Sequence, residues 1–121
     1  MDLNSISSPF SGPITRNDYS TSCGGGSAGE SIFYLDLQPG KALSIAQTTN
    51  QFDSYHQLAY GGSCPGNTSI ACVDDSDLQT LTWANNFDAV ERVYFMIDAY
   101  SGDYGYFTIE WGIFQGNKFE V

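Results

Sequence analysis

Apolar and polar residues alternate with a period of two along most of the chain, which is the pattern of half-buried β-strands. Clusters of Gly, Pro, Asn, Asp and Ser separate the alternating segments and mark turns. Strands are expected over residues 31–37, from 43 onward, and over 55–61, 69–73, 78–83, 92–100 and 106–114. Short strands at a spacing of about 8–12 residues, without a helical segment, predict an antiparallel β-sandwich or barrel.

The alternation also predicts which side chains face the core. The inward sets in the last two segments are Val93, Phe95, Ile97 and Ala99, then Phe107, Ile109, Trp111 and Ile113. The turn at 38–41 indicates a hairpin that joins 31–37 to the next strand.

Tyrosines recur on the predicted outward positions, and Tyr34, Tyr94 and Tyr106 are the candidates for a binding face. On one sheet they would form an aromatic platform for a sugar or a peptide. The alternative is cross-strand aromatic pairing, which stabilises a sheet without binding a ligand.

Length and charge restrict the class of protein. A chain of 121 residues predicts a single domain. Four basic against fourteen acidic residues give a net charge of −10, which argues against nucleic acid and anionic membranes as partners. The sequence contains no apolar run long enough for a membrane span, and residues 1–3 do not begin a signal peptide. If the protein is exported, we therefore expect a mature domain behind an added start Met, or a piece of a longer chain.

Three cysteines leave one without an internal partner. Cys64 and Cys72 flank a Pro-Gly turn, and their spacing predicts a short disulfide loop. Cys23 would then be unpaired or bonded to another molecule. A thiolate zinc site is not expected, because the chain lacks a second cysteine pair and has a single histidine.

Acidic residues are placed to converge at one end of a strand pair. Asp53 precedes the strand at 55–61, and Asp74 and Asp75 follow the strand at 69–73. If the strands pair antiparallel, these carboxylates lie together, and with Ser54, Ser76 or loop carbonyls they provide the oxygen ligands that calcium prefers. The alternative is turn chemistry, in which Asp side chains bond nearby backbone N–H groups. A glycosidase carboxylate pair is less consistent with a solvated loop end.

His56 alternates with Leu58 and Tyr60 on one strand face, which indicates a partly buried structural histidine. A Ser/His/Asp triad is the alternative, but no nucleophile-elbow motif accompanies it. If His56 lies in the core, acid has to charge it there, and the fold becomes acid-sensitive.

Several short sequence segments occur in an order that resembles the bacterial pre-peptidase C-terminal (PPC-like) domains. They lie at residues 17–20, 23–26, 31–40, 52–54, 71–75, 93–102 and 105–109. The resemblance covers about 4–113 and leaves 114–121 as a tail. It implies a jelly-roll-like antiparallel β-sandwich of about eight strands, an extracytoplasmic location, no catalysis and often a calcium ion. A weaker resemblance to CUB domains places Asp53 and Asp98 at calcium-ligand positions.

These observations predict a non-catalytic, secreted or cell-surface accessory or adhesion module, stabilised by calcium. Its expected partner is an extracellular polymer or protein: a polysaccharide, a collagen-like chain or a neighbouring domain. One alternative is a homo-oligomeric surface assembly joined by β-strand addition or by the odd cysteine. A small hydrolase is the second alternative.

Overall fold

The computed structural model describes residues 1–15, 18–23, 29–74, 77–100 and 105–115. Its elements are η1 (Leu3–Ser5), β1 (Phe10–Pro13), β2 (Glu30–Leu37), β3 (Lys41–Asn50), β4 (Ser54–Tyr60), β5 (Thr68–Val73), β6 (Leu81–Ala84), β7 (Glu91–Ala99) and β8 (Tyr106–Gln115). The described part of the chain contains no helix that is long and apolar enough to cross a membrane.

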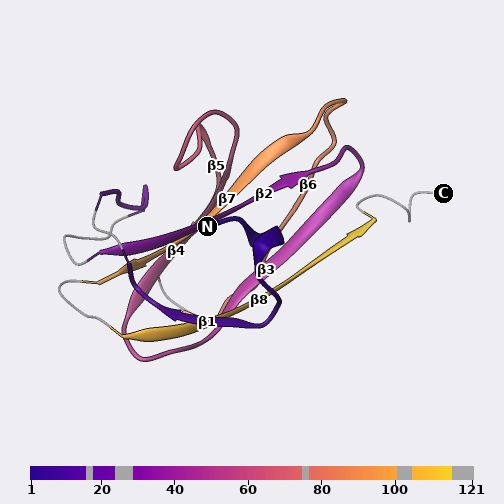
Figure 1. The fold of residues 1–121 in the computed structure, drawn as a ribbon. Coiled ribbons are helices and arrows are strands. Elements are labelled where there is room, and N and C mark those ends of the chain that lie inside the picture. The colour runs from indigo at the N-terminus through magenta and orange to yellow at the C-terminus, as the bar shows by residue number, and fades with distance from the viewer. Residues whose placement is uncertain (16–17, 24–28, 75–76, 101–104, 116–121) are drawn as a thin grey trace.

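The strands form two antiparallel sheets that face each other (Figure 1). Sheet A has the order β2-β7-β4-β5, and sheet B has the order β1-β8-β3-β6. This interleaved order is that of a jelly roll, in which neighbours in the sequence often lie in opposite sheets. The predicted all-β, jelly-roll-like sandwich is confirmed, with eight strands in the described residues.

The core lies between the sheets and is built by the alternation that the sequence shows. Phe33, Leu35 and Leu37 of β2 meet the inward side chains of β7 and β8, and Phe33 packs edge-on against Phe107 with ring centroids 5.9 Å apart. The predicted inward residues of β7 are all in this cluster. Ile113 is an exception, because it lies near the end of β8 and is 48 % exposed.

Two predicted connections have different outcomes. The strands predicted at 55–61 and 69–73 pair antiparallel as β4 and β5, as expected. The hairpin predicted at 38–41 is wrong, because the turn there carries the chain from β2 in sheet A to β3 in sheet B. The predicted tail at 114–121 begins too early, since β8 continues to Gln115, which lies opposite Lys41; residues 116–121 lie outside the described residues.

Sheet A is covered on both faces. On its outer face, Ile32, Tyr94 and Met96 form a second buried cluster. Residues 18–23, which we call the strap, run across this face, and Tyr19 packs against the cluster. The outer face of sheet A is therefore largely an interior surface.

Buried side-chain oxygens hold the strap through its backbone. The main-chain N–H groups of Asp18 and Tyr19 donate to the Glu30 carboxylate, with shortest distances of 2.9 and 3.0 Å. The main-chain N–H of Thr21 donates to Asp98 Oδ2 at 2.9 Å. Glu30 and Asp98 have no exposed surface and lie opposite each other on β2 and β7. A buried carboxylate requires such donors, because its desolvation is otherwise unfavourable.

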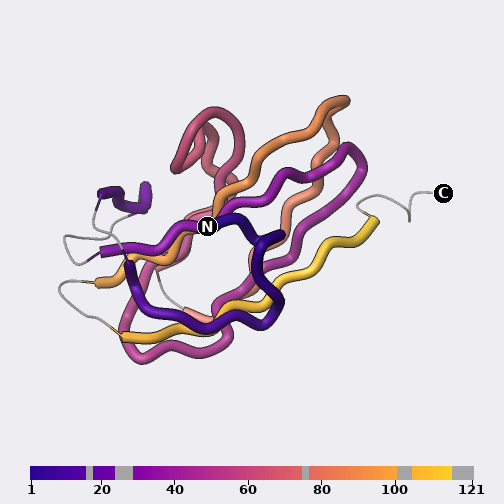
Figure 2. Tube along the Cα trace, in the orientation of Figure 1, coloured from indigo at the N-terminus to yellow at the C-terminus, as the bar shows by residue number. Residues whose placement is uncertain are grey.

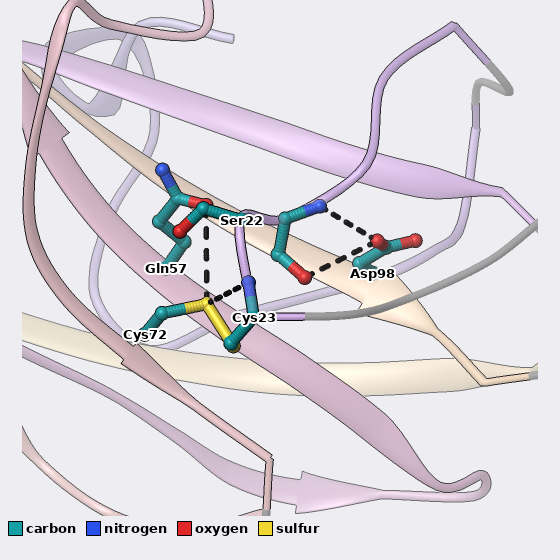
Figure 3. Close-up of a disulfide and its surroundings, with 6 residues drawn as sticks. Ser22, Cys23, Gln57, Cys72 and Asp98 are labelled. Atoms are coloured by element: carbon teal, nitrogen blue, oxygen red, sulfur yellow. Dashed lines mark hydrogen bonds between the residues drawn. A yellow bond between two sulfur atoms is a disulfide. The ribbon is translucent and has the colours of Figure 1, made fainter.

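A disulfide fastens the end of the strap to β5. Cys23 and Cys72 are bonded, and the main-chain N–H of Ser22 donates to Gln57 Oε1 at 2.7 Å beside them (Figure 3). The predicted Cys64–Cys72 disulfide is therefore wrong. Its physical reason is that the Cys72 side chain shares the outer face of sheet A with Gln57, where the strap brings Cys23. Cys64 instead packs against the outer cluster of Ile32, Tyr94 and Met96.

Replacing Cys72 by serine should destabilise the fold much more than replacing Cys64. The disulfide joins cysteines 49 residues apart, and closing a loop of this size stabilises the folded state by about 4 kcal/mol in the chain-entropy model. Urea unfolding of Cys72→Ser, with Cys64→Ser as the matched control, measures the difference. Peptide mapping of the unreduced wild type should show a Cys23–Cys72 crosslink. A Cys64–Cys72 crosslink, or equal destabilisation by both variants, would contradict the assignment.

Candidate functional site

The acidic residues that the sequence grouped as calcium ligands have different surroundings in the structure. Asp53 and Asp74 are exposed and lie at the same end of the β4–β5 pair, as predicted. Asp98 is on the outer face of sheet A and holds the strap, and Asp75 lies outside the described residues. Among the described residues, no group of three or more His, Cys, Asp or Glu side chains is arranged to hold a metal ion. Calcium at Asp53 and Asp74 stays a prediction.

His56 lies in the core, where the alternation placed it. It is 1 % exposed, and its ring stacks on Phe95 with centroids 6.1 Å apart. His56 Nε2 is 3.0 Å from both Gln47 Nε2 and Ser54 Oγ. Because Ser54 is also 1 % exposed, this serine–histidine pair offers no surface to a substrate. The histidine is a structural residue in a buried polar network.

The same network ties the chain beyond β5 to β3. Gln47 Nε2 donates to the main-chain carbonyl of Asp77 at 3.1 Å, and Asn50 Nδ2 donates to the Asp77 carboxylate at 3.0 Å. In the described part of the chain, His56 Nδ1 and Gln47 Oε1 have no hydrogen-bond partner. Burial lowers the pKa of His56 to about 4, because the apolar surroundings disfavour the imidazolium.

We expect His56 to make the fold acid-sensitive. Its pKa is about 4 in the folded protein against 6.5 ordinarily, so between these values the unfolded chain binds the proton and the folded chain does not. Stability is then lost as the pH falls below about 6.5, and the loss approaches about 3 kcal/mol near pH 4. Denaturant unfolding from pH 7.5 to 4, compared between wild type and His56→Gln, isolates this contribution. Parallel pH profiles for the two proteins would contradict it.

The three tyrosines predicted as a binding face do not share a sheet. Tyr34 and Tyr94 lie opposite each other on β2 and β7 of sheet A. Tyr106 begins β8 in sheet B and is 58 % exposed. The prediction is wrong for Tyr106, because the jelly-roll order sends β7 and β8 to opposite sheets.

Tyr34 and Tyr94 line a pocket of about 480 Å³ on the outer face of sheet A. We call it the outer-face pocket; its lining residues are Met1, Ile32, Tyr34, Gly62, Ser63, Cys64, Arg92 and Tyr94. The walls come from the edge strand β2, from β7 and from the β4–β5 loop, which projects from the body of the fold in Figure 2. The first residue closes one side: its N-terminal amine donates to the Ile32 carbonyl at 2.8 Å, and its carbonyl accepts from the Tyr34 N–H at 2.9 Å.

Arg92 supplies the side-chain charge of this pocket, and Asp36 balances it. Arg92 Nε and Nη2 donate to the two Asp36 carboxylate oxygens at 2.8 and 3.0 Å. The guanidinium carbon lies 4.2 Å from the centroid of the Tyr34 ring. Hydrogen bonding to Arg92 lowers the pKa of Asp36, so the carboxylate stays ionised. This pair remains partly open to solvent, since the two charged side chains are 43 % and 46 % exposed.

The β4–β5 loop fixes Tyr94 as a wall of the pocket. Tyr94 Oη donates to the Gly62 carbonyl at 2.7 Å, and burial raises the pKa of this phenol. Gly66 has a φ of +107°, and a Cβ there would lie 2.8 Å from Ala59 Cβ and 3.1 Å from the Tyr94 ring. The loop therefore needs glycine at this position both for its backbone conformation and for close packing on Tyr94.

Gly66→Ala should disturb the pocket, whereas Gly40→Ala should cause backbone strain alone. Gly40 also has a positive φ, of +80°, but no atom lies within 4 Å of the position its Cβ would take. We expect Gly66→Ala to destabilise the protein by about 1–3 kcal/mol more than Gly40→Ala, because the added methyl overpacks the site. Chemical denaturation of both variants measures this, and a smaller loss for Gly66→Ala would contradict the packing described.

The alternation pattern placed Tyr34 and Tyr94 on a candidate binding face, and both line the pocket. It did not single out Arg92 and Asp36. The signal for the missed pair was present once β2 and β7 are aligned, because Asp36 and Arg92 are then directly opposite. Opposite charges at such positions attract each other across a sheet. Comparisons with protein-family models, with curated proteins and with solved structures found no match for this chain.

Proposed function

We propose that the protein is a non-catalytic binding module that works outside the cytoplasm and recognises an extracellular polymer through the outer-face pocket. The observation that carries the proposal is the pocket itself, with Tyr34 and Tyr94 as aromatic walls and the Arg92–Asp36 pair at its rim. A concave site with apolar walls and a few fixed polar groups is the usual form of a small-ligand site.

Rigid support favours binding over a purely structural role for these aromatics. The ring of Tyr94 is held by the β4–β5 loop, and Arg92 is held by two hydrogen bonds to Asp36. Groups fixed before the ligand arrives lose little conformational entropy on binding. The side chains on the accessible part of the outer face are therefore already in position for a ligand. Another part of this face lies under the strap.

Three further observations support the extracytoplasmic setting and the non-catalytic role. The Cys23–Cys72 disulfide suits an oxidising compartment. The buried location of His56 and Ser54 removes the most obvious nucleophile–base pair from solvent. An acidic surface, with a net charge of −10, also favours solubility outside the cell.

The proposal predicts that Tyr34→Ala weakens polymer binding while Tyr106→Ala does not. Both variants remove a tyrosine that is not buried, but Tyr106 lies on sheet B, away from the pocket lining. Losing an aromatic wall should lower retention about tenfold, by analogy with aromatic stacking energies of up to about 1.4 kcal/mol. Co-sedimentation with cellulose, chitin, mannan and collagen measures retention.

Thermal unfolding of both variants serves as a folding control. Retention that is unchanged in Tyr34→Ala, or lost equally in Tyr106→Ala, would reject the outer-face pocket as the binding site. Failure of the wild type to bind any of these polymers would count against the module function.

A further inference from the structure

The side-chain charges of the outer-face pocket cancel each other, which restricts the ligand it fits. Arg92 donates twice to Asp36, so the cation at the rim already has a counter-ion. The other lining residues are Met1, Ile32, Tyr34, Gly62, Ser63, Cys64 and Tyr94, and none of their side chains carries a permanent charge. The N-terminal ammonium of Met1 is a further charge at the wall, and it donates to the Ile32 carbonyl. The surrounding protein has a net charge of −10 and repels anions at long range. An anionic ligand therefore finds no uncompensated side-chain cation among the lining residues.

The walls present two kinds of contact side by side. Tyr34 offers aromatic surface, backed by the nearly buried Tyr94 and Ile32, while Ser63 and the Arg92–Asp36 pair offer hydrogen bonds at the rim. Two N–H groups of Arg92 are used by Asp36, and a guanidinium has five, so donors remain. The Asp36 carboxylate likewise keeps acceptor capacity beyond the two bonds it receives.

We infer that the outer-face pocket binds a neutral saccharide, such as the uncharged sugar residues of a polysaccharide; this inference rests on the proposed binding function. A pyranose has an apolar C–H face that packs on an aromatic ring. It also has adjacent hydroxyl groups that both donate and accept. The planar Arg92–Asp36 pair provides matching acceptors and donors at a fixed spacing. The volume of about 480 Å³ lies in the range of small-ligand sites.

A collagen-like peptide is the principal competing ligand, but the pocket fits it less well. Its proline rings would satisfy the aromatic walls. The peptide carbonyls would accept from Arg92, but the prolines would leave the Asp36 carboxylate without donors, because proline has no N–H and no side-chain hydroxyl. Excluding water from a charged rim without replacing its hydrogen bonds is unfavourable. The charge pair is thus the feature that favours a polyhydroxylated ligand.

Calorimetric titration of the full chain with matched tetrasaccharides tests the inference. The probes are cellotetraose, maltotetraose and mannotetraose as neutral ligands, tetragalacturonate as the anionic one, and a Gly-Pro-Pro repeat peptide. At least one neutral probe should bind with a Kd tighter than about 1 mM. Its affinity should be nearly the same at about 0.05 and 0.5 M NaCl, since screening does not affect an uncharged ligand.

Variants then show which side chains contact the saccharide. Tyr34→Ala should weaken the neutral probe about tenfold, and Arg92→Lys should also weaken it, because lysine keeps the charge but not the planar pair of donors. Tyr106→Ala is the control and should bind as the wild type does. Asp36→Asn should weaken the neutral probe and improve tetragalacturonate binding, because it leaves the charge of Arg92 uncompensated.

The possible outcomes distinguish failure of the saccharide inference from failure of the proposed binding function. Tyr34-dependent binding of tetragalacturonate or of the peptide, in preference to every neutral probe, would overturn the saccharide inference and leave the binding function standing. Binding of no probe to the wild type would overturn the saccharide inference; the binding function then fails only if the polymers are also not retained. Neutral binding that is unaffected by Tyr34→Ala and Arg92→Lys would place the sugar site elsewhere and reject the inference.

Discussion

Satisfaction of buried oxygens on the outer face of sheet A is the constraint on which the rest of this structure depends. Glu30, Asp98 and Gln57 are at most 8 % exposed, and each accepts from a main-chain N–H of the strap. Without these donors, two carboxylates would be buried unpaired at one end of the β2–β7 pair, which is strongly unfavourable. The strap and its disulfide are therefore part of the fold, and they convert an exposed sheet face into an interior one.

The location of the pocket follows from this cover. The strap lies over the part of the outer face that contains Glu30 and Asp98, and the β4–β5 loop covers Tyr94 from the other side. Between these covers, Tyr34 and the Arg92–Asp36 pair remain accessible. A site framed in this way is held by strands and by a glycine-shaped loop, so its side chains are fixed before any ligand arrives.

The sequence predicted the features that depend on local alternation, and it failed where distant segments meet. Seven of the strands and the inward residues of β7 follow from period-two patterning, because one face of each strand is buried in the core. The turn at 38–41 did not reveal that β2 and β3 lie in opposite sheets, since a short turn is compatible with a hairpin and with a crossover. For the same reason, the sequence did not show that Tyr106 lies on the sheet opposite to that of Tyr34 and Tyr94.

The cysteine pairing and the Arg92–Asp36 pair could not be predicted for a related reason, because both depend on contacts between segments that are distant in the sequence. Cys64 and Cys72 are near in sequence, but Cys72 faces the strap that carries Cys23. A signal for the strap did exist: Tyr94 and Met96 are apolar at outward positions of β7, as expected for a strand covered on both faces. Arg92 and Asp36 become neighbours only once β2 and β7 are paired.

The central claim is that the outer-face pocket is a preformed ligand site, and an NMR titration tests it most directly. Amide resonances of the isotope-labelled protein are followed while a neutral oligosaccharide is added. The account predicts that the shifts are concentrated at Tyr34, Gly62, Ser63 and Arg92, with Thr108 and Glu110 of sheet B unchanged. Shifts concentrated on sheet B, or an absence of shifts at saturating ligand, would contradict it.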